Sequence, residues 1–104
     1  MSALVEFSMF PTEQTQSKSV FVARVLDIVD KSGLEYQLTA MGTIIEGETV
    51  EEVLAVISKA YEELQLDCNR VYSSIKIDWR YGPLGRLGKK TGSVEAKLGR
   101  KLKS

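Results

Sequence analysis

The sequence predicts an α+β sandwich with the element order strand, helix, strand, strand, helix, strand, and three observations predict it. Two segments, at about 3–10 and 70–80, alternate apolar and polar residues, which is the period of a half-buried strand. Two segments between them carry apolar residues at helical spacing. A short β-branched run bracketed by Gly42 and Gly47 separates these two helices. A chain of 104 residues supports one modest core, so we expect a single domain.

The first strand runs over residues 3–10 and ends at Pro11, because proline cannot donate to a strand ladder. A polar loop over 12–19 leads into the first helix. That helix ends at Lys31–Gly33, with a basic residue in the last turn and a glycine beyond it. The expected core positions are Ala3, Val5, Phe7 and Met9 of the strand and Val22, Val25, Leu26 and Val29 of the helix.

The second and third strands, over about 35–40 and 43–48, are close enough in sequence to form a hairpin. The second helix begins at Thr49, and Glu52 lies three residues later, where it completes a capping box. Its apolar stripe and the inward face of the last strand should meet in the core. These positions are Val50, Val53, Leu54, Ile57, Tyr61 and Leu64 of the helix and Val71, Ser73, Ile75, Ile77 and Trp79 of the strand.

This order of elements is that of a ferredoxin-like domain, in which right-handed crossovers place both helices on one face of a four-stranded antiparallel sheet. The other face of the sheet, here called the open face, has neither of these helices against it. It carries a mixture of apolar and charged residues, which is typical of a surface that contacts a partner, although a solvated sheet face is the plain alternative. Alternation assigns to it Leu4, Glu6, Ser8, Phe10, Gln37, Thr39, Met41, Tyr72, Ser74, Lys76, Asp78 and Arg80, and leaves open which of Thr43 and Glu46 joins them.

Several classes of function are excluded by residues that the chain lacks. It has no histidine and one cysteine, Cys68, so Ser-His-Asp and Cys-His catalysis, His-bearing zinc sites and a thiolate metal site within one chain are excluded. A P-loop is excluded because Pro83 and Lys90 occupy positions that require glycine and Ser or Thr. An acid/base enzyme that uses only Asp, Glu, Lys or Tyr is the alternative that these exclusions leave open, but no feature of the chain marks one. We therefore expect no catalysis, no metal and no cofactor. A single cysteine rules out a disulfide within the chain and fits a reducing compartment, and we expect neither a signal peptide nor a membrane-spanning run, so the sequence predicts a cytoplasmic protein.

The neutral net charge hides a polarised chain. Residues 1–79 hold 6 basic and 13 acidic side chains, whereas residues 80–104 hold 8 basic side chains and one acidic side chain. A Gly-rich, flexible loop is expected over 81–92 and a short helix over about 93–103, with Val94, Leu98 and Leu102 on one stripe. This apolar stripe favours docking of the tail on the acidic body of its own or a neighbouring subunit. The alternative is an interaction or regulatory module whose basic tail binds nucleic acid or an acidic protein.

Three segments together carry a resemblance to a known family: Glu6–Pro11, Met41–Gly47 and Arg70–Asp78. With this Gly-Thr-x-x-Glu-Gly segment and the later Lys-x-Asp strand, the chain resembles the small thiamine-binding-protein family over about residues 3–80, with a C-terminal helix in the same place. The resemblance implies a ferredoxin-like subunit in a homotetramer, a dimer of dimers with sheet faces packed together. It also implies binding of thiamine or its hydroxymethylpyrimidine moiety without transformation. The loop over 81–92 departs from the family pattern, which is more polar there.

Such a ligand suits the residues found. Thiamine has a cationic thiazolium and an aminopyrimidine with donors and acceptors along one edge, so carboxylates, hydroxyls, exposed glycine backbone and an aromatic face are all suitable partners. The site that the resemblance implies consists of Glu6, Ser8, Gly42, Thr43, Glu46, Tyr72, Lys76 and Asp78. A purely structural role remains open for Glu6, which can pair with Lys76, and for Asp78, which can pair with Arg80 or another subunit.

Overall fold

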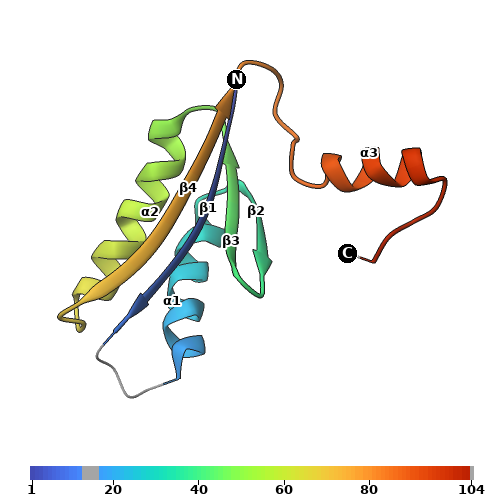
Figure 1. Ribbon diagram of the computed structural model, residues 1–104. Coiled ribbons are helices and arrows are strands. Elements are labelled where there is room, and N and C mark those ends of the chain that lie inside the picture. The colour runs from blue at the N-terminus through green and yellow to red at the C-terminus, as the bar shows by residue number, and fades with distance from the viewer. Residues whose placement is uncertain (13–16, 104) are drawn as a thin grey trace.

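A computed structural model describes residues 1–12 and 17–103, the side chains of 89–91 excepted, so part of the loop expected over 12–19 lies outside the described residues. The strands are β1 (Ser2–Pro11), β2 (Glu35–Thr39), β3 (Gly42–Gly47) and β4 (Val71–Arg80), and the helices are α1 (Lys18–Lys31), α2 (Val50–Gln65) and α3 (Lys89–Leu98). The strands form one antiparallel sheet in the order β2-β3-β1-β4, with α1 and α2 together on one face (Figure 1). The ferredoxin-like arrangement predicted from the sequence is therefore confirmed.

The core lies between the sheet and these two helices. The expected face of β1 is fully buried, and α1 and α2 each contribute one stripe, so strand and helix periods agree on a single apolar layer. The cap of α2 is also as expected: Thr49 Oγ1 accepts a hydrogen bond from Glu52 N at 3.1 Å. The side chain of Glu52 accepts from Glu48 N at 2.9 Å, one residue before its usual partner in a capping box.

The register of β3 decides the question that alternation left open. Its pairing with β1 runs without a bulge from Ala3 opposite Gly47 to Phe7 opposite Thr43. Residues that lie opposite each other in a sheet share a face. Glu46 therefore lies on the open face beside Leu4, and Thr43 lies on the helix-covered face beside Phe7.

One expectation about the core was wrong. Ile75, Ile77 and Trp79 do share the helix-covered face, because they lie opposite the buried residues of β1. Nevertheless, they are 40%, 44% and 49% exposed. Leu54 of α2 is also exposed, at 38%. The reason is that β4 is an edge strand of the sheet, so that among the described residues a neighbouring strand, β1, flanks it on one side only.

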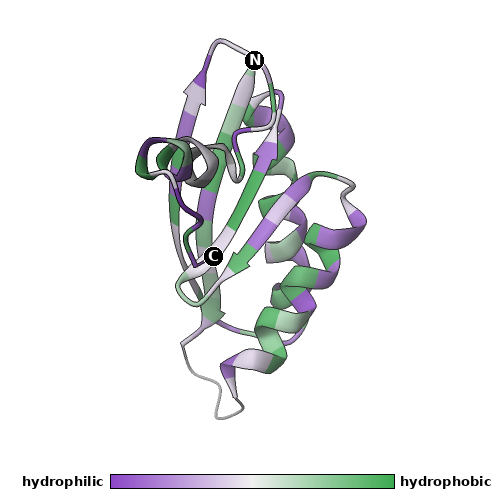
Figure 2. Ribbon diagram, turned by 90° about the vertical axis from the view of Figure 1, so that its right-hand side faces the viewer, coloured by the Kyte–Doolittle hydropathy of each residue, from purple (hydrophilic) through white to green (hydrophobic). Residues whose placement is uncertain are grey.

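The C-terminal helix lies apart from the sandwich. Helix α3 ends at Leu98, earlier than expected, because Gly99 adopts a left-handed conformation with φ of 74° and ends it. Figure 1 shows it standing away from α1, α2 and the sheet, and in the turned view of Figure 2 it lies in front of the sheet. Val94 and Leu98 are exposed. These two residues of the stripe that was expected to dock are therefore not covered by their own subunit, whereas Leu102 is half-buried. No helix in the described part of the chain is long and apolar enough to cross a bilayer.

Candidate functional site

A pocket of about 460 Å³ lies between the start of α1, the tip of the β2–β3 hairpin and the last part of β1. It exists because β1 is longer than β3. On one side β1 pairs with β4 as far as Pro11, whereas on the other side its pairing with β3 ends at Phe7. Within the described residues, the backbone polar groups on that side of Ser8–Phe10 therefore have no partner strand, and these residues line the pocket. Most of the remaining lining is apolar, with Phe7, Val22, Val25, Leu26, Leu38 and Met41.

Three of the expected site residues meet in this pocket: Ser8, Gly42 and Thr43. Ser8 lies on the open face and Thr43 on the helix-covered face, so the pocket wraps around the end of the sheet. The fold itself also requires glycine at position 42, because a Cβ there would lie 2.8 Å from the carbonyl oxygen of Phe7. Only glycine lets the hairpin approach β1 this closely. Gly42 therefore lines the pocket and also allows the close approach of the β2–β3 hairpin to β1 that shapes it.

Three other expected residues lie on the open face beside the pocket: Glu6, Tyr72 and Lys76. Glu6 lies opposite Lys76, and its Cγ lies 3.9 Å from where a Cβ on Gly42 would be. Tyr72 is 56% exposed. Its ring centroid is 6.0 Å from that of Phe10, which lines the pocket. A carboxylate and an aromatic ring thus continue the pocket onto the open face.

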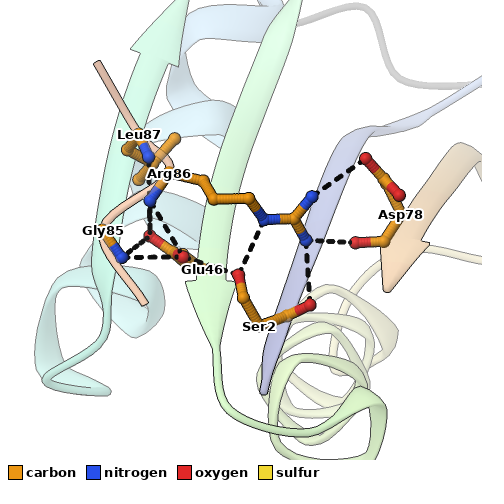
Figure 3. A network of polar contacts seen from close by, with 6 residues as sticks. All are labelled: Ser2, Glu46, Asp78, Gly85, Arg86 and Leu87. Carbon is orange, nitrogen blue, oxygen red and sulfur yellow. Dashed lines mark hydrogen bonds and ion pairs between the residues drawn. The ribbon is translucent and has the colours of Figure 1, made fainter. Parts of the chain in front are cut away.

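The remaining two expected residues, Glu46 and Asp78, lie near the opposite end of β1, beneath the loop that follows β4 (Figure 3). Glu46 is 3% exposed, and its carboxylate accepts hydrogen bonds from Ser2 Oγ at 2.6 Å and from the backbone N–H groups of Gly85 and Arg86 at 3.0–3.1 Å. A longer bond of 3.5 Å comes from Leu87 N. The loop that we expected to be flexible is therefore held along three consecutive residues.

These hydrogen bonds also determine the charge of the buried carboxyl group. Burial alone would raise the pKa of Glu46, but the hydrogen bonds from Ser2 and from the loop backbone outweigh burial and lower the pKa below its ordinary value. Glu46 is consequently ionised at neutral pH. Gly85 has a φ of 96°, a conformation that favours glycine, which explains a glycine at the position where the loop turns its N–H toward Glu46.

Arg86 completes the same network from the other side (Figure 3). Its guanidinium donates to Ser2 Oγ and Ser2 O at 2.8 Å, and to Asp78 Oδ2 and Asp78 O at 3.0 and 2.7 Å. The side chain of Arg86 is only 9% exposed. Asp78 thus pairs with Arg86 rather than with Arg80. In this structure the protein's own groups occupy both Glu46 and Asp78.

Sequence reasoning missed Ser2, Arg86, Phe10 and Lys18 as residues that form or connect these sites. Arg86 had a signal, since it is the only charged residue in the Gly-rich stretch 82–88. Lys18 had none, because its place over the Phe10 ring, 4.2 Å from the centroid, depends on how α1 packs beside β1. The eight expected residues therefore form two groups, one at the pocket and its mouth and one beneath the loop.

Comparisons with known proteins agree with this architecture. The model of a family described as "Thiamine-binding protein" matches residues 5–95. The UPF0045 protein Mb1933 of Mycobacterium bovis is 39% identical over 98 residues, covering 94% of this chain and 96% of that protein. The UPF0045 protein YqgV of Bacillus subtilis is 34% identical over 102 residues, covering 92% and 97%. The crystal structure of the hypothetical protein MJ1052 from Methanocaldococcus jannaschii is similar, with a TM-score of 0.78 and 29% identity over 89% of this chain and 95% of that one.

The matched region includes both groups of site residues, from Glu6 at the pocket mouth to Arg86 in the loop. It spans most of the sheet, both helices of the sandwich and the loop that binds Glu46. This chain belongs to the thiamine-binding protein family.

Proposed function

We propose that this protein binds thiamine or a related hydroxymethylpyrimidine compound without transforming it. One observation above all supports this, namely that Ser8, Gly42 and Thr43 meet in one pocket beside an unpaired edge of β1. Hydroxyls and free backbone groups match the donor and acceptor edge of an aminopyrimidine, and the apolar lining suits a flat ring. Membership of the thiamine-binding protein family supports the same ligand class.

The charges around the pocket favour one orientation of the ligand. Lys18 is the charged side chain in the described lining, and a cation there repels a thiazolium. Glu6 and the exposed ring of Tyr72 lie at the mouth, where both attract a cation. The pyrimidine therefore enters the pocket, and the thiazolium lies over the open face near Glu6. Glu46 and Asp78 then hold the loop rather than the ligand.

The same features support binding rather than catalysis. Proton transfer to and from a substrate requires an acid and a base within hydrogen-bonding reach of the reacting group. In the part of the chain that the structure describes, the pocket lining offers one titratable side chain, Lys18, and the titratable groups Glu6 and Tyr72 lie outside it at the mouth, beside the thiazolium in the proposed orientation. The pocket can thus hold a ring and read its edge, which is the behaviour of a carrier or sensor of the ligand.

A homo-oligomer in the cytoplasm is part of the proposal. Leu4 and Phe10 are only half-buried on the open face and Tyr72 is exposed there, which leaves apolar surface beside the pocket mouth. Packing the open faces of two subunits together would cover this surface and enclose the thiazolium end of the ligand. Tetramer formation through such faces is the assembly that the family resemblance implies.

Calorimetric titration with thiamine, and with hydroxymethylpyrimidine as a fragment, tests the proposal. At physiological salt we expect saturable binding of both. Ser8→Ala should weaken the binding of both compounds about tenfold, which is the effect of one lost hydrogen bond. Glu6→Gln should weaken the binding of thiamine alone. Ser58→Ala, which changes an exposed serine of α2 outside the pocket, serves as the matched control. Absence of binding by the folded protein, or equal losses with Ser8→Ala and Ser58→Ala, would refute the pocket assignment.

The alternative function is nucleic-acid binding by the basic tail, and the same purified protein can be used to test it. Helix α3 stands away from the sandwich, so its surface is accessible (Figure 1). Binding through it would weaken steeply as salt rises, because counterions are released from the phosphates. The truncation for this test must begin after Gly88, since the backbone of Gly85, Arg86 and Leu87 binds Glu46.

A further inference from the structure

Lys76 is a charged residue of the open face to which the proposed function gives no role. It lies on β4 directly opposite Glu6 of β1, and residues of opposite charge in this relation commonly pair across a sheet. Both side chains are exposed, and the ion pairs of the described residues do not include one between them. The carboxylate and the ammonium are therefore both available to a ligand.

The neighbours of Lys76 make one side of it suitable for an anion. Ser74 and Asp78 flank it on the same face of β4, each about 7 Å along the strand. Ser74 lies opposite Ser8, which lines the pocket, so Ser74 is on the pocket side of Lys76. Asp78 lies on the far side, where its carboxylate is already bound by Arg86 at 3.0 Å and disfavours a second anion. An anion at Lys76 is thus directed toward Ser74, whose hydroxyl can donate a second hydrogen bond.

The groups that start in the pocket and continue over the open face have a defined order of charge. The pocket offers a neutral hydroxyl at Ser8 and backbone groups at Gly42. Glu6 comes next, since its Cγ lies 3.9 Å from where a Cβ on Gly42 would be. Lys76 lies one strand further, about 5 Å across the sheet. The order from the pocket outward is therefore neutral, negative and positive.

We propose that the ligand is thiamine monophosphate and that Lys76 and Ser74 bind its phosphate. This inference rests on the proposed function, because it takes the pyrimidine to lie in the pocket and the thiazolium beside Glu6. The phosphate of this compound is attached through an oxyethyl chain on the side of the thiazolium ring away from the pyrimidine. The order of charge along the ligand is therefore neutral, positive and negative, which complements the order on the protein. Hydrogen bonds from an ammonium to a phosphate are also stronger than neutral ones.

The same arrangement distinguishes thiamine monophosphate from two related phosphates. In hydroxymethylpyrimidine phosphate, the phosphate is attached to the methylene that carries the thiazolium in thiamine. It would therefore lie beside Glu6, which repels it. In thiamine diphosphate, the second phosphate would extend past Lys76. The next cation along this face of β4 is Arg80, which lies beyond Asp78 and about 13 Å from Lys76. The open face thus favours a single phosphate on the thiazolium side.

Calorimetric titration of the folded protein with thiamine, thiamine monophosphate and hydroxymethylpyrimidine phosphate tests the inference. We expect thiamine monophosphate to bind about tenfold more tightly than thiamine, which is the effect of one charge-assisted hydrogen bond. Hydroxymethylpyrimidine phosphate should bind more weakly than hydroxymethylpyrimidine. The preference for thiamine monophosphate over thiamine should shrink as the salt concentration rises from about 0.1 M to about 1 M, because exposed charges are then screened.

Substitutions of lysine assign the preference to one side chain. Lys76→Gln should lose the preference for thiamine monophosphate over thiamine, and Lys76→Arg should keep it, because arginine retains the charge and the donors. Lys59→Gln is the matched control, since Lys59 is an exposed lysine of α2 that does not line this pocket. It should leave both affinities unchanged. Circular dichroism verifies that the variants are folded.

The outcomes separate this inference from the proposed function. Binding of thiamine without a preference for its monophosphate would overturn the phosphate site and leave the proposed function intact. A preference that survives in Lys76→Gln but is lost in Lys18→Gln would place the phosphate at the pocket instead, which also overturns the assignment to Lys76. If the folded protein binds none of these compounds, the proposed function fails, and the inference that rests on it fails as well.

Discussion

Replacing Glu46 by glutamine should destabilise the protein by about 2–4 kcal/mol at neutral pH. The carboxylate accepts hydrogen bonds from Ser2 and from three backbone N–H groups while only 3% exposed. Hydrogen bonds to a charged group contribute about 1.5–3 kcal/mol each, against about 1 kcal/mol for neutral ones. A glutamine also replaces one acceptor oxygen by an NH₂ donor, so at least one buried donor loses its partner, at about 1–3 kcal/mol.

The same prediction has a pH dependence with a defined sign. The pKa of Glu46 in the folded protein lies below its ordinary value of 4.5, because its hydrogen bonds outweigh burial. The unfolded chain therefore binds the proton more tightly than the folded one. The stability contributed by the carboxylate is fully present above about pH 4.5 and is lost as the pH falls through the lowered pKa of the folded state. The difference between wild type and Glu46→Gln should shrink in that acidic range.

Urea unfolding followed by circular dichroism, at one protomer concentration, measures both effects. At pH 7 we expect the urea midpoint of Glu46→Gln to fall by roughly 1–2 M. Glu35→Gln is the matched control, because Glu35 lies opposite Glu46 in the sheet but is exposed. A loss no larger than that of Glu35→Gln, or one that stays constant down to pH 3, would show that the buried carboxylate does not anchor the loop.

Four further substitutions test the fold by thermal melting. Gly42→Ala should destabilise the protein by about 1–3 kcal/mol, since its Cβ would lie 2.8 Å from a backbone oxygen. Gly92→Ala, with nothing within 4 Å of the added Cβ, should be neutral or slightly stabilising. Arg24→Met should lower the melting temperature by about 2–6 °C, because its guanidinium binds two carboxylates at the end of α2, at 2.9–3.2 Å in a partly exposed site. Thr49→Ala should cost about 1 kcal/mol through loss of the cap of α2. An Arg24→Met protein that melts like wild type in low salt would contradict the role of that ion pair.

The order and type of the elements followed from the sequence because strand and helix periods are local properties. Alternation in the first and last strands, helical spacing in α1 and α2, and the cap at Thr49 each involve residues close together in the chain. The same alternation predicted which face of the sheet each strand residue lies on, and most residues assigned to the open face lie there. Family resemblance added the ligand class, and the grouping of Ser8, Gly42 and Thr43 is consistent with it.

Burial and partners were decided only by the tertiary structure. The alternation of β4 is correct, yet Trp79 is exposed, because burial depends on whether another element lies above a strand and β4 is at the edge. The sequence singled out Glu46 as a carboxylate on a strand, but its hydrogen-bond donors come from Ser2 and from residues about 40 positions later. Such contacts depend on how distant segments meet in space, and no local period records them. Local patterns thus determined which elements form, whereas long-range packing decided which side chains each element meets.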